Sequence, residues 1–380
     1  MFPLCEHDKC TGCAACAASC PKGCIGMLAD GEGFLHPVIN KELCVDCGIC
    51  SRVCPVKNHS ADDGTEPKCF AARANDADVL KNASSGGVFS LLAASVIERG
   101  GAVFGAAFGK DFSVAHEMCS SPDGLSRLTG SKYVQSDVSD SYKAVREALD
   151  GGKEVLFTGT PCQIAGLKAY LGEDSPLLFT ADLICHGAPS PAVWRSYLSY
   201  REGIAGAKAS SVSFRDKRSG WKRYSLTIGF ANGKEYSAKL TDDMYMRAYL
   251  QDATSRESCA ACPFRQVHRA ADLTMADFWG AESAVPEYAD DRGVSLLMVH
   301  SAKGEELVLR IADRAKMTEV SFRDAVAHNR SATESCAPSP VRRRFIAAAT
   351  RGAFDRAWEK YCGNGFVPRI RRRISKLFNK

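Results

Sequence analysis

From residue 88 onward, apolar runs with helical spacing alternate with short runs rich in Val, Leu, Ile and Phe. Each helical run precedes a β-rich run. The expected helix–strand pairs are Val88–Arg99 with Ala102–Phe108, Ser141–Leu149 with Glu154–Gly159, and Pro161–Leu171 with Pro176–Cys185. Two later stretches, 212–230 and 273–299, are richer in strands. This alternation predicts a mixed α/β domain with a largely parallel sheet.

The first 67 residues follow another pattern. Apolar residues on both sides of residues 30–33 predict a short hairpin, and the polar stretch from Asn58 to Lys68 is typical of a linker. At 380 residues the chain is several-fold longer than such a module, so a second domain with its own core must follow. We expect a small N-terminal domain over 1–67, an α/β domain over 68–335 and a C-terminal extension over 336–380.

Composition indicates an ordinary soluble protein, with 45% hydrophobic residues and a net charge of +5. The longest apolar run, Gly86–Ile97, is too short to span a bilayer. The N-terminal residues lack the basic start and apolar stretch of a signal peptide. Eighteen cysteines in such a chain predict reduced thiols and metal ligation, hence a cytoplasmic protein, and we expect an anaerobic host.

The positive charge is concentrated in residues 341–380, which hold twelve Lys or Arg against two acidic residues. Within this tail, the segment Pro368–Lys380 places Ile370, Ile374, Leu377 and Phe378 at helical spacing among basic residues. That pattern is typical of a basic amphipathic helix for an anionic membrane surface, and equally of a solvated terminus. Nucleic-acid binding is not expected, since basic residues interleaved with aromatics do not occur elsewhere.

Eight cysteines form one pattern that occurs twice. Each copy has the spacing C-x2-C-x2-C-x3-C followed by proline. In bacterial ferredoxins, three close thiolates of such a run bind one [4Fe–4S] cluster and the fourth reaches to the other. The expected ligand sets are Cys10, Cys13, Cys16 and Cys54 for one cluster, and Cys44, Cys47, Cys50 and Cys20 for the second. The pattern therefore predicts a bacterial-type dicluster ferredoxin domain that carries electrons.

Two other interpretations of these eight cysteines are weaker. Structural zinc sites usually combine two C-x2-C pairs for each metal, whereas here two triplets are each completed by a Cys-Pro. Disulfides would require an oxidising compartment, which the N-terminal sequence does not indicate. The doubled spacing favours iron–sulfur ligation.

Four further cysteines lie near predicted strand ends or in loops. Cys162 follows a strand in the turn GTPCQ, where the helix N-terminus would favour its thiolate, and Cys185 closes the next strand. In a parallel sheet both would lie at the carboxyl edge, where ligands bind. Cys259 and Cys262 form a C-x2-C pair in a loop. Spacing alone leaves three alternatives open: a third cluster, a redox or zinc pair, and buried small hydrophobic residues.

Six cysteines remain outside any ligand spacing and are interpreted as non-ligand thiols. They are Cys5, Cys24, Cys69, Cys119, Cys336 and Cys362.

Between about Lys68 and Val326 the chain resembles the family of coenzyme F420 hydrogenase/dehydrogenase beta subunits, which are iron–sulfur flavoproteins. The resemblance rests on six stretches in this order: SSGGVFSLL (84–92), LTGSKYVQSD (128–137), TGTPCQIAGL (158–167), DLICHGAPS (182–190), SCAACPFR (258–265) and ADLTMADFWG (271–280). In that family the cysteines matching Cys162, Cys185, Cys259 and Cys262 ligate a [4Fe–4S] cluster beside an FAD. The resemblance therefore implies a third cluster and a flavin-binding catalytic domain.

The flavin has no simple sequence signature, because neither G-x-G-x-x-G nor a Walker motif occurs. Small residues before the apolar helix offer backbone N–H groups to a phosphate or ring edge, although a capped helix start has the same appearance. The flavin-binding candidates implied by the resemblance and this chemistry are Ser84, Ser85, Gly86, Gly87, Gly130, Ser131, Lys132, Tyr133, Thr160, Asp277 and Trp279. The catalytic candidates are His186 and Lys132, as a proton donor and a cation; a polar turn or core packing would explain each of these residues equally.

Together these features predict an oxidoreductase in which clusters connect a two-electron centre to an external one-electron carrier such as ferredoxin. The resemblance implies F420 or an organic substrate as the partner at the flavin. Two alternatives stay open: a non-catalytic electron-transfer subunit, which would contain clusters but no flavin, and a protein held at a membrane surface or polyanion by its tail.

Overall fold

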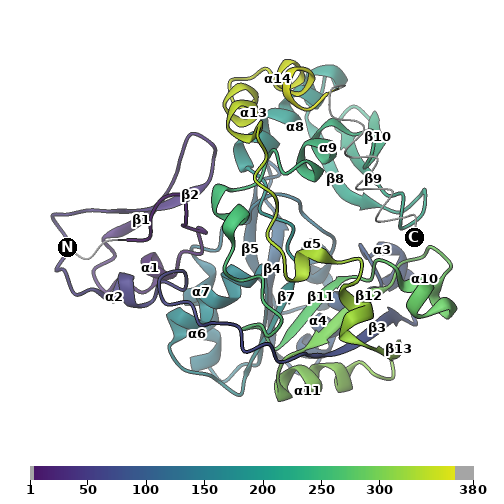
Figure 1. The fold of residues 1–380 in the computed structure, drawn as a ribbon, viewed down its shortest axis with the longest axis horizontal. Coiled ribbons are helices and arrows are strands. Elements are labelled where there is room, and N and C mark those ends of the chain that lie inside the picture. Colours follow the sequence, from purple (N-terminus) through teal and green to yellow (C-terminus); the bar gives the residue numbers. More distant parts are fainter. Residues whose placement is uncertain (1–3, 364–380) are drawn as a thin grey trace.

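The computed structural model describes residues 4–363, and in this part of the chain an eight-stranded mixed sheet forms the centre (Figure 1). Its order is β13-β3-β12-β11-β7-β6-β4-β5. The strands are β3 (Lys68–Ala74), β4 (Ala102–Phe108), β5 (Val114–Cys119), β6 (Val155–Thr158), β7 (Leu178–Leu183), β11 (Leu273–Asp277), β12 (Ser295–Val299) and β13 (Ala315–Val320).

Only the middle of the sheet is parallel. Strands β11, β7, β6 and β4 run in one direction, and the pairings outside them are antiparallel. The expectation of a largely parallel sheet is therefore wrong for the outer strands. Between β4 and β5 the reason is the connection over 109–113, which is too short for the crossover that a parallel pair needs.

Helices cover both faces of this sheet. One face carries α4 (Val88–Ile97), α5 (Leu125–Leu128) and α11 (Ala302–Arg310), and the other carries α6 (Ser141–Asp150) and α7 (Pro161–Leu171). Because successive strand residues point to opposite faces, Val103 packs toward α4 while its neighbour Phe104 packs toward α6 and α7. The short helices α3 (Ala77–Asn82), α10 (Ala281–Ala284) and α12 (Phe322–Val326) complete this body.

A second core lies beside the sheet, at the top of Figure 1. Its elements are α8 (Pro191–Ala205), β8 (Ala209–Asp216), β9 (Ser225–Phe230), β10 (Glu235–Lys239), α9 (Met244–Leu250), α13 (Arg342–Ala349) and α14 (Phe354–Tyr361). Buried aromatic rings, among them Trp194, Phe214 and Tyr245, fill it. The segment 342–361, which the sequence analysis assigns to the extension, thus packs back onto α8.

The proposed amphipathic helix over Pro368–Lys380 lies outside the described residues. Among the helices of residues 4–363, none combines the length and the apolar character needed to cross a membrane.

The cysteine-rich segment forms a small unit at one side of the sheet, drawn in purple in Figure 1. It contains α1 (Ala15–Ala18), the hairpin of β1 (Ile25–Ala29) with β2 (Leu35–Ile39), and α2 (Ile49–Arg52). The predicted hairpin is thus found. Its tip requires glycine, because Gly33 has φ +83° and a Cβ there would lie 2.6 Å from the backbone N of Ala192 in α8. The tip is fixed further by the ion pair of Glu32 with Arg342.

Candidate functional site

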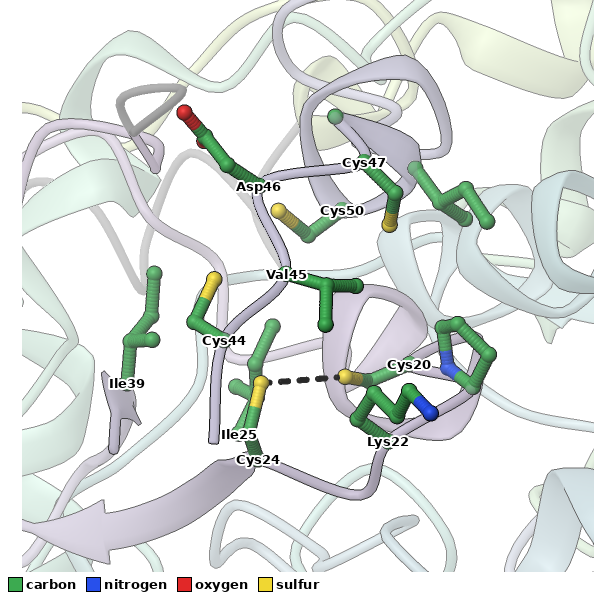
Figure 2. Close-up of a pocket in the computed structure, with 13 residues that line it drawn as sticks. Cys20, Lys22, Cys24, Ile25, Ile39, Cys44, Val45, Asp46, Cys47 and Cys50 are labelled. Carbon is green, nitrogen blue, oxygen red and sulfur yellow. Dashed lines mark hydrogen bonds between the residues drawn. The ribbon is translucent and has the colours of Figure 1, made fainter. Parts of the chain in front are cut away.

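Two hollows in the cysteine-rich segment gather the eight spaced cysteines. The first, here the outer hollow, is lined by Cys20, Cys44, Cys47 and Cys50, with Cys24 beside them (Figure 2). The second, here the inner hollow, is lined by Cys10, Cys13, Cys16 and Cys54, with Cys5 beside them and Cys50 at its border. The cysteine that ends each run therefore contributes to the hollow of the other run, in the sets that the spacing predicts; the ligand assignment itself stays a prediction.

The two runs use the same backbone geometry. Gly12 and Ala14 in the first run and Asp46 and Gly48 in the second all have left-handed φ values, between 51° and 73°. These residues stand at equivalent places in the two copies, after the first and second cysteines of the run. Left-handed residues turn the chain tightly, so each run curls around its hollow before the short helix begins.

The chemistry of the donors fits an iron–sulfur cluster. Burial, together with the nearby Cys10 and Cys54 sulfurs, raises the pKa of the Cys13 thiol to about 11, although a hydrogen bond from the Ala15 backbone opposes this shift. Four crowded thiols cannot all ionise unless a positive centre compensates their charge. A [4Fe–4S] cluster is such a centre and is held by four thiolates.

Each hollow is also lined by a thiol that is not expected at a cluster from the sequence: Cys24 in the outer hollow and Cys5 in the inner one. The Sγ of Cys24 lies 3.3 Å from the Sγ of Cys20, as the dashed line in Figure 2 shows. Cys5 lines the inner hollow, and burial followed by the neighbouring Cys54 and Cys10 sulfurs raises its pKa to about 12. No spacing rule identifies either residue, since Cys5 precedes the first run and Cys24 follows its last ligand by four positions.

The other four predicted cysteines lie at the carboxyl edge of the sheet, here called the edge site. Cys162 lies in the first turn of α7, directly after β6, and Cys185 follows the parallel strand β7. Thr160 caps α7 through a capping box with Gln163, and its Oγ1 lies 3.2 Å from the Cys162 Sγ. The edge position of both cysteines thus follows from the direction of the two strands.

A returning loop brings Cys259 and Cys262 to the same place. Residues 188–190 pair with residues 254–256, and the Ala188 N–H donates to the Cys259 Sγ at 3.4 Å. Gly187, with φ +110°, allows this approach, because a Cβ there would lie 2.8 Å from the Ser255 Oγ. Backbone N–H donors to sulfur are the kind of contact that tunes iron–sulfur sites.

The four sulfurs of the edge site influence one another. Burial, then the sulfurs of Cys262, Cys185 and Cys259, raises the pKa of Cys162 well above its usual value. The helix N-terminus favours the thiolate of Cys162, whereas burial and the neighbouring sulfurs oppose it. As in the inner hollow, four crowded thiols can ionise only when a positive centre compensates their charge, so this donor set fits a thiolate-bound cluster. Cys336 lies near this group as well, and burial is the first of the causes that raise its pKa to about 12.

Two contacts connect the inner hollow to the edge site. On α7, one turn after Cys162, a Cβ at Gly166 would lie 2.9 Å from the Cys13 Cβ, so α1 packs directly on this helix. The buried Arg256 donates from Nε to the Cys10 carbonyl at 2.7 Å, and its own carbonyl accepts from the Cys259 N–H at 3.1 Å. A chain of bonds therefore joins a cysteine of the inner hollow to a cysteine of the edge site.

The small residues proposed for flavin binding have partners of their own. The Ser84 Oγ accepts from the Ser131 N–H at 2.8 Å, so the two glycine-containing turns meet. The Gly86 N–H already donates to the Ser295 Oγ at 3.0 Å, and a Cβ on Gly86 would lie 2.3 Å from the Ala72 carbonyl. Packing between strands thus accounts for Gly86. Gly87, with φ +85°, directly precedes α4, and the Ser85 Oγ donates to the Val294 carbonyl.

The two proposed catalytic residues, Lys132 and His186, also have contacts within the fold. The Lys132 ammonium donates to the carbonyls of residues 127, 128 and 129 at the end of α5, each at 3.0 Å, while burial lowers its pKa to about 7. His186 is exposed, and its Nδ1 lies 3.0 Å from the Ser331 Oγ. Lys132 therefore has a capping role in the fold, and the catalytic roles of both residues stay predictions.

A buried ion pair organises the rest of the predicted flavin residues. Arg215 forms a two-pronged pair with Asp277 at 2.6 and 3.0 Å, and its Nη1 also donates to the Tyr133 hydroxyl. The indole of Trp221 donates to Asp277 and stacks on Trp279 at 4.7 Å. Asp277 ends β11, so this group occupies the same sheet edge as Cys185.

Sequence reasoning missed Arg215, Trp221 and Arg256. Arg215 lies inside the strand-rich stretch 212–230, which was the one available signal, because a charged residue that is buried in a strand requires a partner. The Nε of Arg215 is buried with no hydrogen-bond partner within residues 4–363. Arg215 and Trp221 form, with Asp277, Tyr133 and Trp279, a polar and aromatic group at the strand ends, which is the composition typical of a cofactor site.

Comparison with known families accounts for most of the chain. Residues 9–58 match the family "4Fe-4S dicluster domain", residues 69–143 match "Coenzyme F420 hydrogenase/dehydrogenase, beta subunit N-term", and residues 152–325 match the C-terminal part of the same beta subunit. The chain belongs to the family of coenzyme F420 hydrogenase/dehydrogenase beta subunits. It combines both parts of such a subunit with a 4Fe-4S dicluster domain, as the sequence resemblance predicts.

The individual proteins that match this chain share low sequence identity with it. It is 27% identical over 171 residues to one subunit of the F420H2 dehydrogenase of Methanosarcina mazei, covering 42% of this chain and 47% of the relative. It is 28% identical over 204 residues to an uncharacterized protein of Methanocaldococcus jannaschii, covering 46% and 56%. The match thus spans about half the length of these curated relatives. A chain of the F420-reducing [NiFe] hydrogenase complex from Methanosarcina barkeri aligns with 17% identity and a TM-score of 0.47, over 79% of this chain and 94% of that one.

Proposed function

We propose that this protein is an iron–sulfur flavoprotein oxidoreductase. It passes electrons between a ferredoxin-like carrier and a substrate that gives or takes hydride at FAD. The observation that carries this proposal is the connection between the inner hollow and the edge site, where Cys13 packs on α7 and Arg256 bonds to both Cys10 and Cys259. A ferredoxin domain that served only as a separate carrier would not need to hold one of its cluster sites against a second set of cysteines.

The burial of the two hollows supports an order for the electron path. Cys10 and Cys13 of the inner hollow are each 8% exposed, whereas Cys47 of the outer hollow is exposed. Leu43 and Val45, beside the outer hollow, are 55% and 58% exposed. A small apolar rim of this kind suits brief contact with a redox protein, whose interfaces are typically small. We infer that the external carrier contacts the outer hollow and that electrons continue through the inner hollow to the edge site.

The edge site would hold a third [4Fe–4S] cluster through Cys162, Cys185, Cys259 and Cys262. The neighbouring group of Tyr133, Arg215, Asp277, Trp221 and Trp279 would hold the FAD. FAD, when bound, supplies the exchange between two-electron hydride transfer and one-electron transfer to clusters.

In that role the chain's own side chains have distinct tasks. The indole rings supply a flat apolar surface against which a ring system can pack. The Arg215 guanidinium supplies fixed positive charge: burial opposes that charge, but Asp277 and the neighbouring tyrosine hydroxyls outweigh it and raise the pKa of Arg215 well above its usual value. The Ala188 N–H, which donates to the Cys259 sulfur, would stabilise negative charge there.

F420 is the first candidate for the hydride partner. The support is the family membership and the name of the Methanosarcina mazei relative, an F420H2 dehydrogenase component. An organic substrate reduced with electrons from ferredoxin is the second candidate. The two differ in the direction of electron flow, which a reduction assay distinguishes.

Anaerobic cofactor analysis tests the proposal. The purified full chain should contain about twelve iron atoms, four for each cluster, and one FAD. The Cys162→Ala variant should lose about four iron atoms and keep the ferredoxin pair, whereas Cys119→Ala, a buried thiol outside all three sites, should lose none. Absence of flavin would overturn the enzyme proposal and favour the non-catalytic electron-transfer subunit. An iron content near eight atoms would mean that the edge site holds no cluster and would overturn the proposal of a third one.

Flavin reduction identifies the partner. The reconstituted protein is mixed anaerobically with F420H2, NAD(P)H or reduced ferredoxin, and flavin bleaching is followed. Rapid bleaching by F420H2 is the expected result. Bleaching by reduced ferredoxin alone would contradict F420 as the partner and favour the organic substrate.

A further inference from the structure

Two histidines and an aspartate gather near the tip of the hairpin of β1 and β2, apart from the residues that line the two hollows. Asp30 directly follows β1, His36 lies in β2, and His7 lies in the turn before the first cysteine run. One donor atom from each of the three side chains lies within 4.8 Å of the other two. Nothing in the electron path described above uses this group.

The distances between these donors suit a metal ion better than hydrogen bonds. The Oδ2 of Asp30 lies 3.3 Å from the Nε2 of His36 and 3.7 Å from the Nε2 of His7. Both distances are longer than the usual N–H···O distance of about 2.7–3.2 Å. In a tetrahedral zinc site with bonds of about 2.0–2.1 Å, neighbouring ligand atoms lie about 3.3–3.4 Å apart. A small rotation of the His7 side chain, which is 66% exposed, brings the three donors to these separations.

The turn of the hairpin holds the Asp30 carboxylate with one oxygen free for an ion. Its Oδ1 accepts from the N–H groups of Glu32 and Phe34, each at 2.9 Å. These two bonds fix the side chain, so Oδ2 is the oxygen that faces the two imidazole rings. Carboxylates that bind metal ions are commonly held in this way by further hydrogen bonds.

The ring of His36 is held in place without blocking its metal-binding nitrogen. The Nη2 of Arg256 lies 3.0 Å from its Nε2 and 3.2 Å from its Nδ1. Nearly equal distances to both nitrogens place the guanidinium over the face of the ring, away from the plane in which a metal binds. His7 also stacks on this ring, with centroids 3.7 Å apart. Burial, then the charges of Arg256 and His7, lowers the pKa of His36 to about 4, so the ring is neutral at pH 7, as a ligand must be.

We propose that His7, Asp30 and His36 bind one Zn²⁺ ion, with a water molecule in the fourth position. Two imidazole nitrogens and one carboxylate oxygen form a donor set that is typical of zinc, and three protein ligands leave one position open. The histidines bind through Nε2 and the aspartate through Oδ2, and no electron is transferred. The proposal is independent of the flavin and of the third cluster, because the site uses none of their predicted ligands.

The ion fastens the beginning of the described chain to the hairpin. Residues 4–5, which directly precede the turn of His7, line the inner hollow. His36 rests on Arg256, and Arg256 also donates to the Cys10 carbonyl at the same hollow. Zinc at this position therefore keeps the segment before the first cysteine run over the inner hollow and holds the hairpin against Arg256.

Zinc content tests the proposal on the full chain, with its clusters in place and without an affinity tag. After incubation with zinc sulfate and desalting, the parent should retain about one zinc ion per chain. His7→Ala and Asp30→Asn should lose this zinc with unchanged iron content. The matched control is His268→Ala, because His268 lies 3.8 Å from the single carboxylate of Asp63 and is 39% exposed. Absence of zinc from the parent, or equal zinc in the parent and both site variants, would overturn the proposal.

X-ray absorption at the zinc edge identifies the ligands in the same sample. We expect nitrogen and oxygen neighbours at about 2.0–2.1 Å and no sulfur at about 2.3 Å. Sulfur neighbours would place the zinc in one of the cysteine sets and would also overturn the proposal.

Iron release tests the fastening role. The inner four iron atoms should leave to an iron(II) chelator several-fold more slowly in the zinc-loaded parent than in the zinc-free parent. In His7→Ala, added zinc should leave this rate unchanged. Equal rates for the zinc-loaded and zinc-free parent would contradict the role of the ion at the inner hollow.

Discussion

The inner and outer hollows have the same cysteine spacing and the same left-handed turns, yet their surroundings differ. At the inner hollow, the buried Arg256 donates to the carbonyl of Cys10, the first cysteine of its run. At the outer hollow, the exposed Arg52 donates to the carbonyl of Cys47, the second cysteine of its run, at 3.2 Å. A duplicated motif therefore gives two sites that share cysteine spacing and differ in what they contact.

We expect the largest difference in stability between substitutions of these two arginines. Arg256→Met leaves buried acceptors of Cys10, Leu35 and Gln135 without a donor, so we expect the free energy of unfolding to fall by about 3 kcal/mol. Arg52→Met removes an exposed contact and should change it by less than about 0.5 kcal/mol. Denaturant unfolding under anaerobic conditions measures both.

The same pair of variants tests the proposed path. Arg256→Met should slow electron transfer from reduced ferredoxin to the flavin, because it removes the bonded connection between Cys10 and Cys259. Arg52→Met should leave this rate unchanged. Equal slowing by both substitutions would mean that the inner hollow has no special connection to the edge site.

A smaller effect is expected where α1 packs on α7. A Cβ at Gly166 would lie 2.8 Å from the Tyr142 hydroxyl and 2.9 Å from the Cys13 Cβ, whereas a Cβ at Gly203 in α8 meets nothing within 4 Å. Both are helical glycines, so alanine improves helix propensity at both by up to about 1 kcal/mol. We expect Gly203→Ala to stabilise the protein and Gly166→Ala to destabilise it by about 1–2 kcal/mol.

Iron release shows where the Gly166→Ala substitution acts. The inner four iron atoms should leave faster than in the parent, while those of the outer hollow should leave at the parental rate. If Gly166→Ala and Gly203→Ala are equally stable, the inner hollow does not pack tightly against α7.

The smallest effect concerns pH. Burial, then the charge of Arg256 and the neighbouring His7, lowers the pKa of His36 to about 4, below the unfolded value of about 6.5. Between these values the unfolded chain binds more protons, so stability present above pH 6.5 is lost as the pH falls toward 4. From pH 7 to 5.5 we expect a loss of about 1 kcal/mol from this group.

Thermal unfolding of His36→Gln and the parent at both pH values measures this loss. The variant should show less pH dependence than the parent, and His59→Gln, a substitution in the linker, serves as the matched control. Identical pH dependence in His36→Gln and the parent would exclude His36 as its source.

Sequence reasoning succeeded where short-range rules apply. The bounds of α7 follow from Thr160 and Pro161 at its start, and the hairpin follows from the polar turn between two apolar runs. The same reasoning did not identify Arg215 or Trp221, because their partner Asp277 lies 62 and 56 positions away in the chain. It also did not foresee that burial raises the pKa of Cys162, since the helix N-terminus is visible in the sequence but burial is not.

The cysteine sets of the two hollows were determined by the sequence alone. Within each run the local backbone holds three cysteines together, and the fourth member of each set follows from the doubled ferredoxin-type spacing, in which the last cysteine of one run serves the other cluster. Only the tertiary structure decided which hollow faces the sheet edge and which faces solvent. That choice depends on contacts such as Arg256 with Cys10, across 246 positions, and on side-chain packing that no local pattern encodes. For the same reason, the sequence does not show that the thiols of Cys5 and Cys24 lie in the two hollows; only the folded structure shows it.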